Sequence, residues 1–289
     1  CMPSEDIVQQ AQQHLESQYP CRVVYGEDCY QPLSAEQRAN IVLDYCFDDS
    51  IDLLWAFRGG EGSADVIPYL QPHVERLVTM QHKRWLGFSD ITAMLLYFSK
   101  HCQWPVVHGP CANAFVKGLL DEHTNAAMQR ILHQQSGVTT IDDLLPLNDI
   151  AAASGMIHAN MVAGNLSLLN VSVKDSWELV ADGRIVIIED VNEKPHVIAR
   201  TLKYLKRVGV LQSPAALIFG GFTINADSSV IASPHAQETL PVLSKFSQSC
   251  EYPVFMSAQV GHGKSNIPVP FDVSAALTTG VAGECSLVF

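Results

Sequence analysis

The chain has 289 residues and a formal net charge of −12, with 47% hydrophobic and only 17% charged residues. This apolar fraction excludes an intrinsically disordered chain, and the length allows one large domain or two ordinary ones. The acidic balance argues against a nucleic-acid-binding protein, because phosphate contacts need clustered Lys and Arg.

Eight cysteines are spread along the chain without a C-x-x-C pair, and the 11 histidines include no H-E-x-x-H motif. A disulfide scaffold is shorter and denser in cysteine, and a zinc site shows closely paired ligands. We therefore expect reduced thiols in a cytoplasmic protein that binds neither a metal nor a cofactor.

A helix, a strand and a turn are predicted early in the chain. Ser34 and Gln37 have the spacing of a capping box, which predicts a helix after Ser34. Residues 51–57 form an apolar run that only Asp52 interrupts, which is typical of a strand covered on both faces. A glycine-rich turn follows at 58–62, and it is not a P-loop because no G-K-[ST] follows. The turn either supplies oxyanion donors beside an arginine for a substrate carboxylate, or is a plain loop.

A short strand, a turn and a helix are predicted over residues 85–96, with Ser89 at the turn. This placement exposes the hydroxyl at a helix N-terminus, where backbone N–H groups can bind an oxyanion. The segment resembles a nucleophile elbow, although Ile91 occupies the position of the second glycine of G-x-S-x-G. Alternatively, Ser89 is only a helix N-cap.

The middle of the chain changes in composition. Residues 119–155 are rich in Gln, His and Asp, which predicts a connecting segment between two domains. Residues 150–173 carry no Asp, Glu, Lys or Arg and are long enough to mimic a membrane span. Their asparagines, serines and glycines instead predict a buried segment of a protein that does not enter a membrane.

Residues 184–188 predict a second apolar strand, which ends in Glu189 and Asp190. A glutamate at this position can orient a histidine as the third member of a serine triad, or it is simply a solvated strand end. A helix is predicted from Pro195 to the stop at Gly209. Its predicted apolar side comprises Ile198, Leu202, Leu205 and Val208.

Two further strands are predicted at residues 215–219 and 254–258, and the second is followed by His262 between two glycines. A histidine with so little steric cover suits a general base, or it is an ordinary surface-loop residue. Alternating strands and helices predict an α/β fold, in which ligands gather at the carboxyl ends of the strands.

These features form an ordered set: Arg58-Gly59-Gly60, Gly87-Phe88-Ser89-Asp90, Gly164-Asn165-Leu166-Ser167, Glu189, and Gly261-His262. The set resembles the LD-carboxypeptidase family, the serine peptidases that include muramoyl-tetrapeptide carboxypeptidase and the microcin C immunity protein. The resemblance covers residues 34–270. It implies an N-terminal Rossmann-like parallel-sheet domain and a C-terminal α/β domain with a mixed sheet, with the active site between them. We expect these domains at 1–118 and 156–289, joined by the segment 119–155.

The resemblance also implies the roles of five residues. Ser89 matches the family's nucleophile, Glu189 matches the glutamate after the apolar strand, and His262 matches the histidine of the G-H block. The oxyanion hole is implied to consist of the backbone N–H groups of Asp90 and Gly60.

The implied reaction is hydrolysis of the amide between an L-centre and a terminal D-amino acid. The expected case is release of D-Ala from a murein tetrapeptide during cell-wall recycling, by a cytoplasmic homodimer. A terminal carboxylate needs a cation, and Arg58 is the candidate. Glu61 stands at the mouth of the site where the family usually has tyrosine, and Pro270 stands where it often has glycine. The family's first strand usually precedes the point at which this chain starts, so we expect natural residues before Cys1.

Two other functions remain open. One is an amidase of the microcin-immunity type, acting on peptidyl or aminoacyl nucleotides. Such an enzyme needs an aromatic platform for a base, and no added aromatic loop is evident between residues 189 and 262. The other is an α/β ligand-binding protein without catalysis, in which Ser89 is only a cap.

Overall fold

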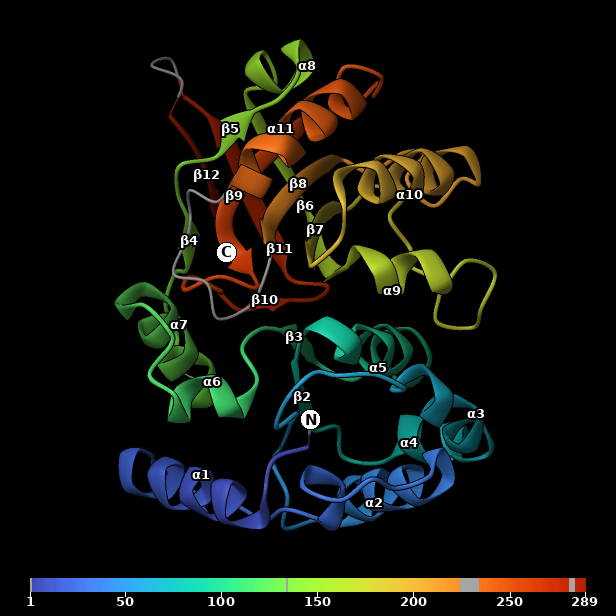
Figure 1. Ribbon diagram of the computed structural model, residues 1–289, viewed down its shortest axis with the longest axis vertical. Helices are drawn as coiled ribbons and strands as arrows, with labels where there is room; N and C mark the ends of the chain where they lie inside the picture. The colour runs from blue at the N-terminus through green and yellow to red at the C-terminus, as the bar shows by residue number, and fades with distance from the viewer. Residues whose placement is uncertain (1, 134, 224–233, 281–283) are drawn as a thin grey trace. The chain divides into compact units, whose positions relative to one another are not determined.

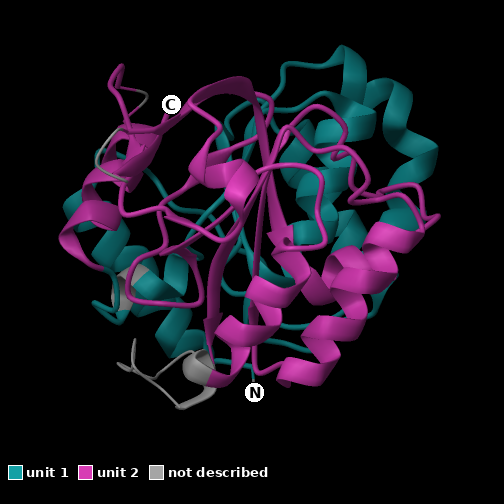
Figure 2. Ribbon diagram, turned by 90° about the horizontal axis from the view of Figure 1, so that it is seen from above, with its two compact units in different colours: residues 1–120 teal, residues 121–289 magenta. Residues whose placement is uncertain are grey.

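The computed structural model describes residues 2–133, 135–223, 234–280 and 284–289 (Figure 1). The chain divides into two compact units, residues 1–120 and 121–289, which Figure 2 colours separately. The segment 119–155, expected to connect two domains, carries α7 (Glu122–Leu132), β4, β5 and α8 (Asp149–Ala152), and from residue 121 it belongs to the second unit.

Three parallel strands lie in the first unit, in the order β1 (Leu53–Trp55), β2 (Arg84–Gly87) and β3 (Val106–His108). The longer helices of this unit are α1 (Glu5–Gln18), α2 (Ala35–Phe47), α3 (Ile67–Leu70), α4 (Val74–Thr79), α5 (Thr92–Tyr97) and α6 (Ala112–Val116). The predicted capping box is confirmed, because Ser34 Oγ accepts from the Gln37 N–H while the Gln37 side chain accepts from the Ser34 N–H.

β1 is shorter than the run 51–57 predicts, and only its central residue is buried, so the expectation of a strand covered on both faces is wrong there. α5 is the opposite case, since all six of its residues are buried. It contacts β2 and β3, and the π-helical turn Phe98–Cys102 continues it. The helix that follows Ser89 is therefore a core element, which fixes the serine turn from its C-terminal side.

The second unit contains an eight-stranded mixed sheet in the order β4-β12-β11-β6-β7-β8-β9-β5. Strands β6 to β9 are parallel, and the strands on either side of them are antiparallel. The strands are β4 (Thr140–Ile141), β5 (Leu145–Pro146), β6 (Met156–Asn165), β7 (Ile185–Val191), β8 (Ala216–Thr223), β9 (Val254–Gly261), β11 (Ser274–Thr279) and β12 (Cys285–Val288). The α/β class with a parallel sheet and a mixed sheet is as predicted.

The predicted parallel strands are confirmed and extended. β7, β8 and β9 begin within one residue of their predicted starts, and β7 and β8 are buried along almost their whole length. α9 (Leu166–Val171) contacts β6 and β7, while α10 (Pro195–Arg207) and α11 (Pro234–Ser247) contact each other beside β8 (Figure 1).

Two expectations need correction. α10 buries Ile198, Leu202 and Leu205 as predicted, but Val208 is 39% exposed because the helix has already ended at this C-cap position. The segment 150–173 is buried mainly in its second half, and Met156 is 62% exposed. The first half of β6 pairs with β11 in the antiparallel part of the sheet, where its residues alternate in exposure. None of the helices in the described ranges has the length and apolarity needed to cross a bilayer.

Candidate active site

Ser89 occupies a strained turn at the carboxyl end of β2. Its φ of 62° lies in the left-handed region, which a residue with a side chain adopts at a cost of about 1–3 kcal/mol. Phe88 and Ile91 occupy the N-cap positions of the two helical segments that follow, and neither segment has a side-chain cap, so Ser89 caps neither. The structure thus has the strand–turn–helix geometry that the sequence predicts, with a half-buried hydroxyl at the turn.

Gly87 makes this turn possible. A methyl group at Gly87 would lie 2.8 Å from Cγ2 of Ile91 and 3.0 Å from Cβ of Ala56. Ile91 therefore occupies space that any side chain at position 87 would need. A glycine before the serine allows an isoleucine after it, which explains how this turn forms without the second glycine of G-x-S-x-G.

The glycine-rich turn after β1 lies directly against Ser89. A methyl group at Gly59 would be 3.0 Å from Cβ and 3.1 Å from Oγ of Ser89. Gly60 has a φ of 142°, and a methyl group there would lie 2.9 Å from a guanidinium nitrogen of Arg58. Arg58 thus folds back over Gly60, and it also contacts Sδ of Met2 at 2.8 Å. Glu61 is exposed at the tip of the turn, and its carbonyl accepts from Arg38 at 3.4 Å.

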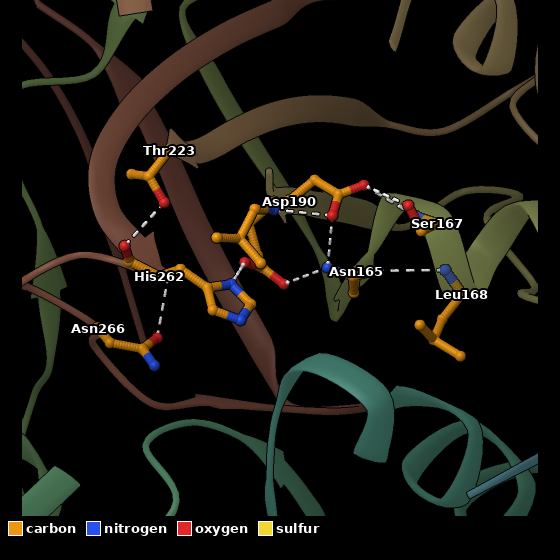
Figure 3. Close-up of polar contacts among 10 residues, drawn as sticks. Asn165, Ser167, Leu168, Asp190, Thr223, His262 and Asn266 are labelled. Carbon is orange, nitrogen blue, oxygen red and sulfur yellow. Dashed lines mark hydrogen bonds and ion pairs between the residues drawn. The ribbon is translucent and has the colours of Figure 1, made fainter. Parts of the chain in front are cut away.

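In the second unit, the structure pairs His262 with Glu189. Nδ1 of His262 lies 2.5 Å from Oε2 of Glu189, and the two side chains are only 8% and 1% exposed (Figure 3). Burial alone would lower the pKa of His262, but the negative charges of Glu189 and Asp190 outweigh it and raise that pKa above its ordinary value. The strand-end glutamate is therefore a buried histidine partner and not a solvated side chain.

Three further residues join this pair, and the sequence interpretation gave none of them a role. Asn165 is the strand neighbour of Glu189, and its Nδ2 donates to Glu189 Oε1 at 3.2 Å and to Asp190 Oδ1 at 2.9 Å (Figure 3). Ser167 donates to Asp190 Oδ2 from its backbone at 3.0 Å and from Oγ at 2.8 Å. The side-chain amide of Asn165 thus donates to both of these adjacent carboxylates.

Asp190 is almost completely buried beside another carboxylate. Burial and the charge of Glu189 raise its pKa to about 6, although hydrogen bonds from Ser167, Val191 and Asn165 lower it. A signal for this cluster was available, because Asn165 and Glu189 follow apolar strands whose carboxyl ends meet at one edge of a parallel sheet.

Glycines and a short loop fix the histidine. Gly261 has a φ of 114°, and a methyl group there would lie 2.7 Å from Cβ of Glu189. The Gly261 N–H donates to Oδ1 of buried Asn266 at 3.0 Å, and Thr223 Oγ1 donates to the His262 carbonyl at 3.0 Å (Figure 3). The loop therefore holds the imidazole against the carboxylate.

The predicted site residues fall into two groups. Ser89 and Asp90 lie with the turn that carries Arg58, Gly60 and Glu61 in the first unit. Glu189 and His262 lie together in the second unit. Among the residues that the structure describes, no group of three or more His, Cys, Asp or Glu side chains is arranged to hold a metal ion.

Comparison with known proteins gives a consistent result for both units. Residues 1–109 match the LD-carboxypeptidase N-terminal domain, and residues 158–277 match the LD-carboxypeptidase C-terminal domain. A protein of Rickettsia conorii that is named as a putative carboxypeptidase is 34% identical over 244 residues, which cover 84% of this chain and 73% of that protein. A protein of Bacillus subtilis that is named as a probable murein peptide carboxypeptidase is 27% identical over 233 residues, covering 80% of this chain and 70% of that protein.

Solved structures share the fold at lower sequence identity. Muramoyltetrapeptide carboxypeptidase from Oxalobacter formigenes has a TM-score of 0.80 and 23% identity, with 100% of this chain and 95% of that chain covered. An MccF-like protein from Streptococcus pneumoniae, solved in complex with AMP, has a TM-score of 0.77 and 18% identity, with 97% and 92% covered. Because the domain matches span most of the sequence, the chain belongs to the LD-carboxypeptidase family.

Proposed function

We propose that the protein is a serine carboxypeptidase that hydrolyses the amide between an L-centre and a C-terminal D-amino acid. Ser89 is the nucleophile, His262 the general base and Glu189 the residue that orients the imidazole. The observation that carries this proposal is the buried pairing of Glu189 with Nδ1 of His262 at 2.5 Å. With Nδ1 directed to the carboxylate, Nε2 is the nitrogen that takes the proton of Ser89.

The first half of the reaction acylates the serine. Ser89 Oγ attacks the carbonyl carbon as Nε2 of His262 takes its proton. The N–H groups of Gly60 and Asp90 donate to the oxyanion, an interaction worth roughly 10²–10³ in rate per donor. The tetrahedral intermediate then collapses, and His262 returns the proton to the leaving amine of the D-amino acid. This sequence requires that the two units bring Ser89 within hydrogen-bond reach of His262.

The second half releases the peptide. His262 takes a proton from a water molecule, which attacks the acyl ester on Ser89, and the serine recovers its proton as the carboxylic acid leaves. Imidazolium forms in both halves, and the charges of Glu189 and Asp190 that raise the pKa of His262 stabilise it. The reaction uses the side chains and backbone of this chain alone, without a metal or cofactor.

The substrate in this proposal is a murein tetrapeptide, which loses D-Ala during cell-wall recycling in the cytoplasm. Family membership and the name of the Bacillus subtilis relative support this choice. Arg58 is the cation proposed to bind the terminal carboxylate, and Glu61 is proposed to contact the substrate from the tip of the same turn. A homodimer is the proposed assembly.

A second candidate is an amidase that acts on aminoacyl or peptidyl nucleotides. The observation in its favour is the shared fold with MccF-like proteins, one of which was solved with AMP. Both candidates use the same nucleophile and differ only in the group that leaves or binds beside it.

A substrate panel separates the candidates. The protein is incubated in EDTA with a murein tetrapeptide ending in D-Ala, with the same peptide ending in L-Ala, and with an aminoacyl sulfamoyl adenosine, using Ser89→Ala as the blank. We expect free D-Ala from the first peptide only, and none from the variant. Cleavage of the adenosine conjugate alone would favour the amidase, and no turnover of any member of the panel would contradict catalysis at this site.

A further inference from the structure

A pair of buried hydrogen bonds ties the serine turn to the glycine-rich turn in the first unit. Oδ2 of Asp90 accepts from the Ser63 N–H at 3.0 Å, and Ser63 Oγ donates to the Asp90 carbonyl. Both residues are buried. We call this pair of contacts the Asp90–Ser63 clasp. It joins the residue after the proposed nucleophile to the residue that directly follows the glycine-rich turn.

The clasp lies beside both proposed oxyanion donors. One donor is the N–H of Asp90 itself, and the other is the N–H of Gly60, three residues before Ser63. The residues that directly precede the two donors are also in contact, since the backbone of Gly59 lies against the side chain of Ser89. Backbone hydrogen bonds hold the chain after β1 as far as Phe57, whose carbonyl accepts from the Asn113 N–H at 3.0 Å. Beyond Phe57 the glycine-rich turn depends on side-chain contacts, and the clasp is the one that links it to the serine turn.

A second anchor holds the other side of the same turn. Arg38, on α2, donates to the Glu61 carbonyl at 3.4 Å and to the Gly62 carbonyl at 2.9 Å. A methyl group at Gly62, where φ is 84°, would lie 2.8 Å from that guanidinium. Burial raises the pKa of Asp90 above its ordinary value, although the hydrogen bonds to Ser63 and the charge of Arg38 lower it. The turn is thus fixed at its tip by Arg38 and at its end by Asp90.

Resting on the proposed function, we propose that Asp90 is a positioning residue whose side chain, through Ser63, fixes the spacing of the Gly60 and Asp90 N–H groups before substrate binds. Oxyanion donors act on charge that develops in the transition state, so their spacing matters for turnover more than for binding. A purely structural contact of the same kind would affect stability and leave the chemical step unchanged.

The test compares Asp90→Ala with Asp90→Asn, which keeps an oxygen acceptor for the Ser63 N–H. We expect Asp90→Ala to lower kcat for D-Ala release by roughly 10- to 100-fold with KM within about threefold, because small displacements of catalytic groups cost up to about 10² in rate. Asp90→Asn should recover most of that loss. Ser63→Ala, which removes only the hydroxyl donor, should have a smaller effect of the same kind.

A matched control is available in the same unit. Asp48 accepts from the Ser50 N–H at 2.8 Å, close to the start of β1 and so away from the glycine-rich turn. Asp48→Ala likewise removes a carboxylate that accepts from a backbone N–H, although at an exposed position, and it should leave kcat within about twofold. If Asp90→Ala does not fold, Ser63→Ala decides the question: a lower kcat with KM unchanged supports the proposal, and an unchanged kcat overturns it.

A fluorophosphonate probe separates failure of this proposal from failure of the substrate assignment, because it reacts with an activated serine whatever the natural substrate. We expect the rate of Ser89 labelling to fall in Asp90→Ala in parallel with kcat and to be restored in Asp90→Asn. If the wild-type protein is labelled but releases no D-Ala, the substrate assignment is wrong. The labelling rates of the variants then still test the role of the clasp. Unchanged kcat and labelling in Asp90→Ala, or a raised KM with unchanged kcat, would overturn the proposal.

Discussion

The serine turn and the histidine pair are built by different physical means. Ser89 is positioned by backbone conformation: a positive φ, a glycine two residues before it, and the backbone of Gly59 against its side chain. His262 is positioned by buried charge: its Nδ1 pairs with the Glu189 carboxylate, and the negative charge of Asp190 also raises its pKa. The first region should therefore be sensitive to added atoms, and the second to altered charge.

The largest expected effect comes from charge alone. Glu189→Gln keeps the shape of the side chain but replaces the carboxylate that faces His262, so the tautomer is no longer fixed and imidazolium loses its partner. We expect kcat for D-Ala release to fall by roughly 10³- to 10⁴-fold. Steady-state kinetics measures this loss, with Glu251→Gln, exposed near the start of β9, as the control. A loss in kcat of less than tenfold would show that Glu189 does not act in the mechanism.

The corresponding change in the first unit adds one methyl group and no charge. Gly59→Ala places a methyl about 3 Å from the Ser89 side chain, so the turn or the serine must shift. We expect a loss of about 10² in kcat, because reacting groups tolerate little displacement. Gly183→Asn is the control, because position 183 has a left-handed φ that asparagine accepts and open space around it. Activity of Gly59→Ala within threefold of wild type would contradict the close packing described above.

The side-chain amide of Asn165, which donates to both Glu189 and Asp190, allows a prediction of which of two variants loses more activity and stability. Asn165→Ala removes the donor between Glu189 and Asp190, and we expect about a tenfold loss in kcat together with a lower free energy of unfolding, because two buried acceptors lose a partner. Asn165→Asp has nearly the native shape but adds a carboxylate beside two others, so it should be worse than alanine on both measures. Chemical denaturation and kinetics together test this order. Asn165 Oδ1 also accepts from the Leu168 N–H at the start of α9, an acceptor that aspartate keeps. The reverse order would show that this cap, and not charge, governs the region.

The smallest effect is on pH dependence. Asp190 contributes to the raised pKa of His262, so in Asp190→Asn the pKa of His262 should fall and the acid limb of the kcat/KM profile should move to lower pH. If the acid limb does not move, the charge of Asp190 does not affect the pKa of His262.

The same variant changes the pH dependence of stability. The pKa of Asp190 is raised in the folded protein from 3.8 to about 6, so the folded state binds more protons between these values and wild-type stability falls as pH rises through that window. The stability of Asp190→Asn relative to wild type should therefore rise from pH 4 to pH 7, by at most about 3 kcal/mol. Thermal or urea unfolding at both pH values measures this difference.

Much of the fold could be predicted because the informative patterns are local. The capping box at Ser34 and the apolar runs of β7, β8 and β9 are read from a few neighbouring residues. The antiparallel half of the second sheet was not predicted in detail. β4 and β5 are two residues long, and their pairing depends on distant segments that no local pattern specifies.

The candidate site shows the same limit. Residue type and position after apolar strands made Ser89, Glu189 and His262 candidates, and the resemblance to the LD-carboxypeptidase family implied their roles. The role of Asn165 depends on its register with Glu189 across two strands, and the role of Asp90 depends on a contact with Ser63, 27 positions away. Neither spacing has a repeating sequence pattern, so these contacts become evident only in the folded protein.

The central claim is that Ser89 is a nucleophile activated by the His262–Glu189 pair. The most direct measurement is to label the protein with a fluorophosphonate and locate the adduct by peptide mass spectrometry, in wild type and in His262→Ala. The account predicts a single adduct on the peptide that contains Ser89, and loss of that adduct in His262→Ala. A wild-type protein that releases D-Ala but carries no adduct on Ser89, or labelling of Ser89 that persists in His262→Ala, would contradict it.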